Sequence, residues 1–176
     1  ESRGLGDVYK RQLQDDAVAL SGTSTELAEG FAGTVTAHTG TLAITNNDYT
    51  ITQLETIAGA SSGTITFTTT DRALSGNSTN LAAALANTSN YDGAVAITNA
   101  DYTLDELVAI NNGTGGAITF TTATTALSGT STKFAQALAG SITYGGAVTI
   151  TNNDYTLDQL VTINAGTSGA ITLTHD

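Results

Sequence analysis

Three acidic turns are the first residues to consider as a functional site. The motif Asn-(Asn/Ala)-Asp-Tyr-Thr occurs at 46–50, 99–103 and 152–156. Carboxylate and amide oxygens suit a hard cation, so Asp48, Asp101 and Asp154 are candidate calcium ligands. Each turn supplies few oxygens, however, and an Asx turn leading into a helix N-terminus accounts for the same residues. We expect the turn, with no metal and no cofactor.

The remaining titratable residues do not form a catalytic pattern. His38 and His175 are the only histidines, and neither lies in a segment that recurs. A Ser-His-Asp triad would need one of them beside an activated serine. The carboxylate pairs Asp105-Glu106 and Asp15-Asp16 are sequence neighbours, which do not face one another on a helix. Because the chain also lacks cysteine, a thiol nucleophile is excluded and we expect no enzyme. The weaker alternative is a fragment of an enzyme whose catalytic part lies outside this chain.

Threonine forms a candidate ligand face. Thr-x-Thr patterns on strands would present hydroxyls and methyls in a near-regular array, which resembles the ice-binding surfaces of some antifreeze proteins and could also hold a glycan. The alternative is that threonine is simply a good exposed strand residue. The residues of this candidate face are Thr64, Thr66, Thr68, Thr119, Thr121, Thr149, Thr151, Thr172 and Thr174.

Composition narrows the classes of partner. The formal net charge is −11, and an acidic surface repels phosphate backbones and anionic lipids. No apolar run approaches the roughly 18 residues that span a bilayer. We therefore expect neither nucleic acid nor a membrane as partner.

These residues are positioned by an internal repeat. Ala-Leu-Ser-Gly-(Thr/Asn)-Ser-Thr occurs at 19–25, 73–79 and 126–132, and the three aspartates of the acidic turns are spaced 53 residues apart. Such a period is typical of arrays whose units cannot bury their apolar faces alone. We assign residues 1–13 to a non-repeat leader and 14–176 to one repeat domain, with repeats at about 19–72, 73–125 and 126–176.

Each repeat is predicted to contain two strand-helix units. Short β-rich runs such as 94–98 and 117–121 precede helical spacing, and capping boxes mark the helix starts at Thr23/Glu26, Thr50/Gln53, Thr103/Glu106 and Thr156/Gln159. Shorter helices are expected at about 25–31, 79–86 and 132–139. Gly113 is expected to end its helix in a left-handed conformation. The stretches 34–38 and 141–144 could form extra short strands, whereas the matching stretch 87–92 has the composition of a loop. This segment varies between repeats and is expected on the surface.

A strand, a helix and a return to the next strand imply parallel pairing. The fold class is therefore α/β: an α/β solenoid with one parallel sheet and short helices on one face. The strand residues expected to face the helices are Ile65, Phe67, Val95, Ile97, Ile118, Phe120, Val148, Ile150, Ile171 and Leu173. Their expected helical partners are Leu54, Ile57, Leu81, Leu85, Leu107, Ile110, Phe134, Leu138, Leu160 and Ile163.

The Thr/Ala/Gly-rich, cysteine-free units with a Tyr-Thr-Leu-Asp-Gln-Leu helix resemble repeats in very large secreted or cell-surface proteins of bacteria, of the marine and cyanobacterial adhesin-like type. The resemblance implies an extracellular or cell-surface structural or adhesive role without catalytic residues. Many such proteins carry calcium-binding Gly-Gly-x-Gly-x-Asp nonapeptides, which this chain lacks. The leader string Gly-Asp-Val-Tyr-Lys-Arg-Gln resembles a translated sequencing-adapter remnant from metagenomic reads.

Neither end of the repeat array shows an evident polar cap. An uncapped end exposes apolar side chains and a free strand edge. We therefore expect self-association through the ends of the array, and a glycan is the other candidate partner.

Overall fold

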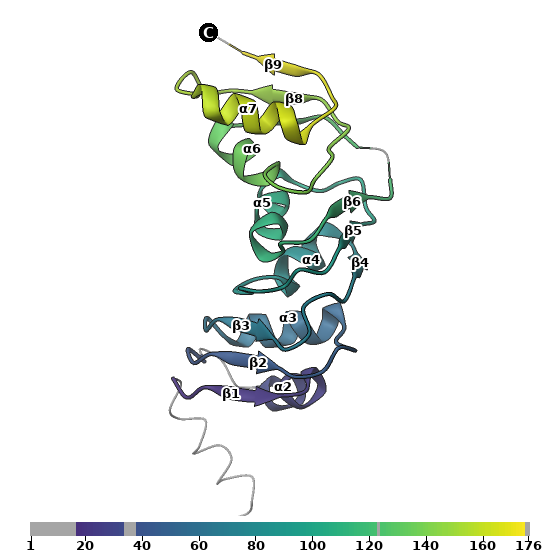
Figure 1. Ribbon diagram of the computed structural model, residues 1–176, viewed down its shortest axis with the longest axis vertical. Coiled ribbons are helices and arrows are strands. Elements are labelled where there is room, and N and C mark those ends of the chain that lie inside the picture. The colour runs from purple at the N-terminus through teal and green to yellow at the C-terminus, as the bar shows by residue number, and fades with distance from the viewer. Residues whose placement is uncertain (1–16, 34–37, 123, 175–176) are drawn as a thin grey trace, which may run out of the picture.

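A computed structural model describes residues 17–33, 38–122 and 124–174 (Figure 1). The predicted leader, the Asp15-Asp16 pair, His175 and residues 34–37 of the first variable stretch lie outside the described residues. The chain is α/β, with short helices and short parallel strands alternating along it.

All three repeats have the same order, strand-helix-strand-helix-strand. Repeat one contains β1 (Leu20–Gly22), α2 (Ser24–Phe31), β2 (Leu42–Ile44), α3 (Ile51–Ala60) and β3 (Ile65–Phe67). Repeat two contains β4 (Leu74–Gly76), α4 (Ser78–Ala84), β5 (Val95–Ile97), α5 (Leu104–Gly113) and β6 (Ile118–Phe120). Repeat three contains β7 (Leu127–Gly129), α6 (Ser131–Ala137), β8 (Val148–Ile150), α7 (Leu157–Gly166) and β9 (Ile171–Leu173).

The strands form three parallel three-stranded sheets, β1-β2-β3, β4-β5-β6 and β7-β8-β9. They follow one another along the long axis of the molecule (Figure 1). The prediction of one sheet and of two strands per repeat was therefore wrong. The missed strands are the Leu-Ser-Gly segments, whose serine and glycine carry little β-propensity and which are ordered by pairing with the next strand.

The variable stretches explain why the sheet is interrupted. Instead of β4, the edge of β3 meets the segment after α4, through a single parallel bridge between Ile65 and Thr88. The edge of β6 meets the segment after α6 in the same way, between Ile118 and Ile142. Tyr91, Ile142 and Tyr144 in these segments are buried, as is His38 at the end of the first variable stretch, so the prediction that the stretches lie on the surface was wrong for these residues.

The helices begin where the capping signals predicted. All four predicted capping boxes are present, on α2, α3, α5 and α7. The predicted left-handed Gly113 is wrong: it lies inside α5, and Thr114 is the C-cap in an extended conformation. A Cβ at Gly113 would lie 2.6 Å from the Leu85 carbonyl oxygen, so the glycine permits close helix packing.

The core lies between strands and helices, as the apolar pattern predicted. Most of the predicted strand and helix positions are buried, including the pair Val95 and Leu107 in the middle repeat. The exceptions are Phe120, Leu160 and Ile171, which are partly buried, and Leu173, which is exposed. Three of these four belong to repeat three.

Two aromatic clusters join consecutive repeats. The rings of Tyr49 and Phe67 in repeat one lie 5.0 Å apart, and Tyr91 of repeat two lies 5.5 Å from Phe67. Tyr102, Phe120 and Tyr144 repeat this arrangement at the next junction. In the first cluster the Tyr49 and Tyr91 hydroxyls donate to the backbone carbonyls of Thr69 and Arg72. In the second, the Tyr144 hydroxyl donates to the Thr125 carbonyl, and the Tyr102 hydroxyl accepts from the Thr125 N–H. Edge-to-face and tilted aromatic pairs of this kind add about 0.5–1.5 kcal/mol each beyond burial.

Candidate functional site

The recurring polar residues form one hydrogen-bond network in each repeat. Its centre is a fully buried serine at the first position of the short helix: Ser24, Ser78 or Ser131. The first amides of a helix have no partner within the helix, so a buried one needs an acceptor from elsewhere. That acceptor comes from the acidic turn of the following strand-helix unit.

The asparagine of the turn makes the same two contacts in each repeat. The backbone N–H of the buried serine donates to its Oδ1 at 2.7 Å, and its Nδ2 donates to the serine Oγ at 3.0 Å. The Nδ2 also donates to the aspartate two residues later. The asparagines are Asn46, Asn99 and Asn152.

The side chain at the third position of the longer helix completes each network. Glu106 Oε2 accepts from Ser78 Oγ at 3.0 Å, and Glu106 Oε1 accepts from Thr79 Oγ1 at 2.7 Å. Gln53 and Gln159 accept from their serines in the same way, and their amides donate to Thr25 and Thr132. Each network therefore joins the N-termini of two consecutive helices.

Glu106 is the one ionisable group at this position in the three networks. Burial acts to raise its pKa, but hydrogen bonds from Thr79, Thr103 and Ser78 together outweigh burial, so the pKa of Glu106 lies below its ordinary value of 4.5. The carboxylate form is thus the one that the network stabilises.

The candidate calcium ligands are also members of the networks. The Asn46 side chain, donating to Asp48, is the largest cause that lowers the pKa of that carboxyl, and Asn99 acts likewise on Asp101. Asp154 accepts from Asn152. Within residues 17–33, 38–122 and 124–174, no group of three or more His, Cys, Asp or Glu side chains is placed to hold a metal ion. Each of these carboxylates accepts a hydrogen bond from the asparagine amide two residues earlier.

The candidate threonine face is divided among the three sheets. Thr66, Thr119 and Thr172 occupy the middle positions of β3, β6 and β9. The hydroxyls of Thr66 and Thr119 donate to the carbonyls of Leu42 and Val95 on the neighbouring strand, at 3.2 and 3.4 Å. Thr121 and Thr174 make the same kind of bond, while Thr64, Thr68, Thr149, Thr151 and Thr172 have exposed or half-buried side chains. Whether this face binds a ligand stays a prediction.

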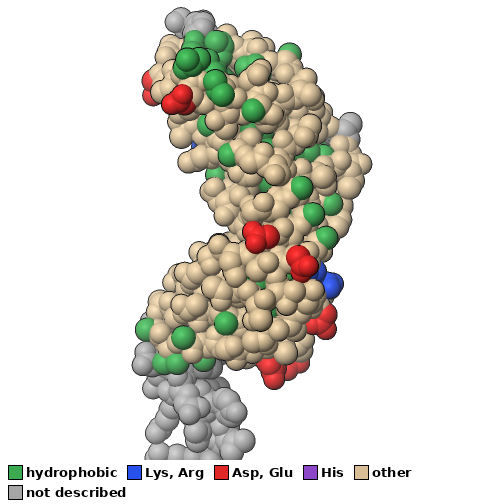
Figure 2. Space-filling model, in the orientation of Figure 1, with side chains coloured by type: hydrophobic (Ala, Val, Ile, Leu, Met, Phe, Trp, Pro, Cys, Tyr) green, Lys and Arg blue, Asp and Glu red, His purple; other side chains and the backbone are tan. Residues whose placement is uncertain are grey.

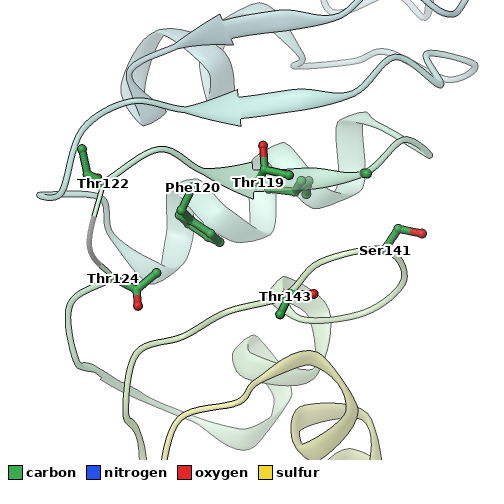
Figure 3. Close-up of a pocket in the computed structure, with 8 residues that line it drawn as sticks. Thr119, Phe120, Thr122, Thr124, Ser141 and Thr143 are labelled. Carbon is green, nitrogen blue, oxygen red and sulfur yellow. The ribbon is translucent and has the colours of Figure 1, made fainter.

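A hollow of about 490 Å³ lies where repeats two and three meet. Phe120 projects from β6 toward the segment that carries Ser141 and Thr143 (Figure 3). The rest of its lining is largely threonine and backbone: Ala117, Ile118, Thr119, Thr122 and Thr124. Hydroxyl groups beside an aromatic ring are suited to a sugar, which offers hydroxyls and an apolar ring face.

At the equivalent place between repeats one and two, one side chain bonds to the backbone of β3. Asn90 Oδ1 accepts from the Phe67 N–H at 2.8 Å, and Asn90 Nδ2 donates to the Phe67 carbonyl at 2.9 Å, so the amide acts as a strand residue. Thr143 stands at the matching position of repeat three and is too short to reach both groups. The bridge there is also shifted by one residue, and the hollow results.

The remaining candidate residues lie apart from one another. His38 is buried against Phe31, with ring centroids 5.4 Å apart, and its Nε2 has no partner among the described residues. Asp105 pairs with Lys133 at 2.6 Å on the surface and does not face Glu106. No helix within the described residues has both the length and the apolar character needed to cross a membrane.

Sequence reasoning missed the partner of each asparagine. The turn was interpreted as serving its own helix, whereas the asparagine caps the helix that lies 21 or 22 residues earlier. The signal was present, because a serine recurs 21 or 22 residues before the asparagine in every repeat. Comparison of the chain with protein-family models, curated proteins and solved structures gave no match.

Proposed function

We propose that this chain is a non-enzymatic structural segment, an α/β solenoid built for length, from a secreted or cell-surface bacterial protein with an adhesive role. One observation carries the proposal: the polar residues that recur in all three repeats are occupied in hydrogen bonds between consecutive helices. A site for chemistry keeps such groups directed toward a substrate, whereas here they join neighbouring units.

Continuity along the array supports the solenoid. The Asn87 side chain of repeat two donates to the Ser61 carbonyl of repeat one at 3.0 Å, and aromatic clusters span both junctions. Units that contact only their neighbours transmit tension in series.

Single-molecule pulling from the two termini tests this role. A structural array should unfold in successive steps, each releasing about one repeat, on the order of 15 nm of chain. If the protein extends like an unfolded chain, with no force peak above the noise, a tension-bearing role is contradicted.

The second candidate is glycan binding, with ice binding as the related alternative on the threonine face. The hollow beside Phe120 favours a sugar, because hydroxyls and an aromatic ring line it. A glycan array and an ice-recrystallisation assay separate these functions from the structural one. Replacing Thr66, Thr119 and Thr172 with lysine should abolish a real signal, and the structural proposal predicts no signal to abolish.

A further inference from the structure

The outer face of α7 exposes apolar side chains, and the counterparts of one of them, Leu157, are covered in the other repeats. Leu157 is 75% exposed and Val161 is 61% exposed, and Leu173 of the last strand, β9, is 36% exposed. Figure 2 shows hydrophobic side chains gathered at this end of the molecule. Neighbouring exposed aliphatic residues on a small domain are typical of a binding surface.

The molecule itself shows what covers this position. Ile51 and Leu104 correspond to Leu157, and each rests on the glycine of the next repeat's Leu-Ser-Gly strand. A Cβ at Gly76 would lie 2.7 Å from Ile51 Cδ1, and a Cβ at Gly129 would lie 2.5 Å from Leu104 Cδ2. As a result, Leu104 is only 7% exposed.

The matching glycine at the other end of the chain is free of such a contact. Gly22 closes the Leu-Ser-Gly strand β1, and among the described residues the three atoms nearest to a Cβ there belong to Glu26 and Leu27 of its own repeat, the nearest at 3.3 Å. We propose that a second copy of this chain docks head to tail, with Leu157 of one copy resting on Gly22 of the next. The internal junctions α3 to β4 and α5 to β7 are the template for this contact.

Charge makes this contact weaker than its internal templates. At the α5–α6 junction, Lys133 pairs with Asp105 at 2.6 Å. By repeat position, Glu26 corresponds to Lys133 and Asp158 to Asp105, so two carboxylates would meet between copies. The net charge of −11 adds repulsion. Head-to-tail association should therefore increase with salt, which screens exposed charges.

Sedimentation velocity of the full chain over a range of concentrations tests the proposal. Wild type should associate more strongly at high salt than at low salt. Asp158→Lys should strengthen association at low salt by about tenfold, because it restores the opposite charges of the template. Asp71→Lys makes the same charge change on an exposed residue between β3 and β4, and should have little effect.

Two blocking variants fix the direction of the contact. Leu157→Ser removes the apolar side chain at the C-terminal end of the contact, and Gly22→Val fills the space at the N-terminal end. Each variant alone should remain monomeric. An equimolar mixture should form a dimer, because each variant keeps the end that the other lacks. Circular dichroism confirms that both variants fold. A Gly22→Val protein that still dimerises would overturn the proposal in favour of a tail-to-tail pair. Wild type that stays monomeric at every concentration and salt level would overturn it altogether.

Discussion

At the scale of single residues, the arrangement depends on small polar side chains with fixed partners. Ser78 is completely buried, yet its N–H and its hydroxyl both have partners from the next strand-helix unit. A buried polar group without a partner costs about 1–3 kcal/mol. The recurring serine and asparagine are therefore needed together, and neither can be replaced alone without a penalty.

Adjacent asparagines in one turn give a matched test. Asn46→Ala removes the contacts to the Ser24 N–H and Oγ and should lower the free energy of unfolding by about 2 kcal/mol. Asn47→Ala should cost less than about 0.5 kcal/mol, because alanine already stands at the equivalent position 100. Urea denaturation measures both. Equal losses would mean that the network does not stabilise the fold.

The lowered pKa of Glu106 predicts how the stability of the protein depends on pH. Its folded-state pKa lies below 4.5, so its ionised form contributes stability above the unfolded-state pKa, and this contribution is lost as the pH falls through the folded-state pKa. Glu106→Gln adopts the residue of the other two networks and removes this contribution. The difference in melting temperature between wild type and Glu106→Gln should shrink from pH 7 to pH 3. A difference that is constant with pH would contradict the account.

At the scale of elements, the helices depend on packing more than on their own sequence. The short helices span seven or eight residues and would be marginal in isolation. Their N-termini are secured by caps and their apolar faces by the strands. The longer helices α5 and α7 include their final glycine, which approaches the preceding helix closely: Gly113 meets Leu85 and Gly166 meets Leu138.

Two helical glycines should respond in opposite directions. Gly59 has open space around it, so Gly59→Ala should stabilise the protein by up to about 1 kcal/mol through helix propensity. Gly113→Ala should destabilise it despite the same propensity gain, because its Cβ would lie 2.6 Å from backbone of Leu85. Thermal unfolding of the two variants provides the comparison. Stabilisation by both would show that the helices are not closely packed.

Sequence predicted the elements whose signals are local and missed those that depend on distant partners. Capping boxes lie within four residues, so the starts of α2, α3, α5 and α7 could be predicted. The strands β1, β4 and β7 could not, because Leu-Ser-Gly becomes a strand only by pairing. In the same way, the asparagine turn was recognised, but its contact with an earlier helix was not, and the break between β3 and β4 has no local signature.

At the scale of the whole molecule, the three repeats have the same order of elements, but the two junctions between them differ. At the first junction Asn90 bonds to the Phe67 backbone, whereas a hollow lies beside Phe120 at the second. The core is held together by apolar packing. In the networks, the carboxylates accept hydrogen bonds from uncharged amide and hydroxyl groups. Folding should therefore proceed without a divalent ion.

Calorimetry with EDTA and then with millimolar calcium tests that expectation. The melting temperature should change by no more than a degree or two, because a ligand stabilises the native state only where it binds. A rise of about ten degrees on adding calcium, lost in the Asp48→Asn, Asp101→Asn and Asp154→Asn triple variant, would instead identify the turns as metal sites.

The central claim is that each acidic turn caps a helix of the preceding strand-helix unit. Amide hydrogen exchange measured by NMR tests this claim most directly. The first amides of the short helices, in Ser24, Ser78 and Ser131, donate to asparagine side chains. The first amides of the longer helices, in Ile51, Leu104 and Leu157, have no such acceptor among the described residues. The account predicts that the serine amides exchange more slowly, by about tenfold or more. Equal and fast exchange at all six positions would contradict it.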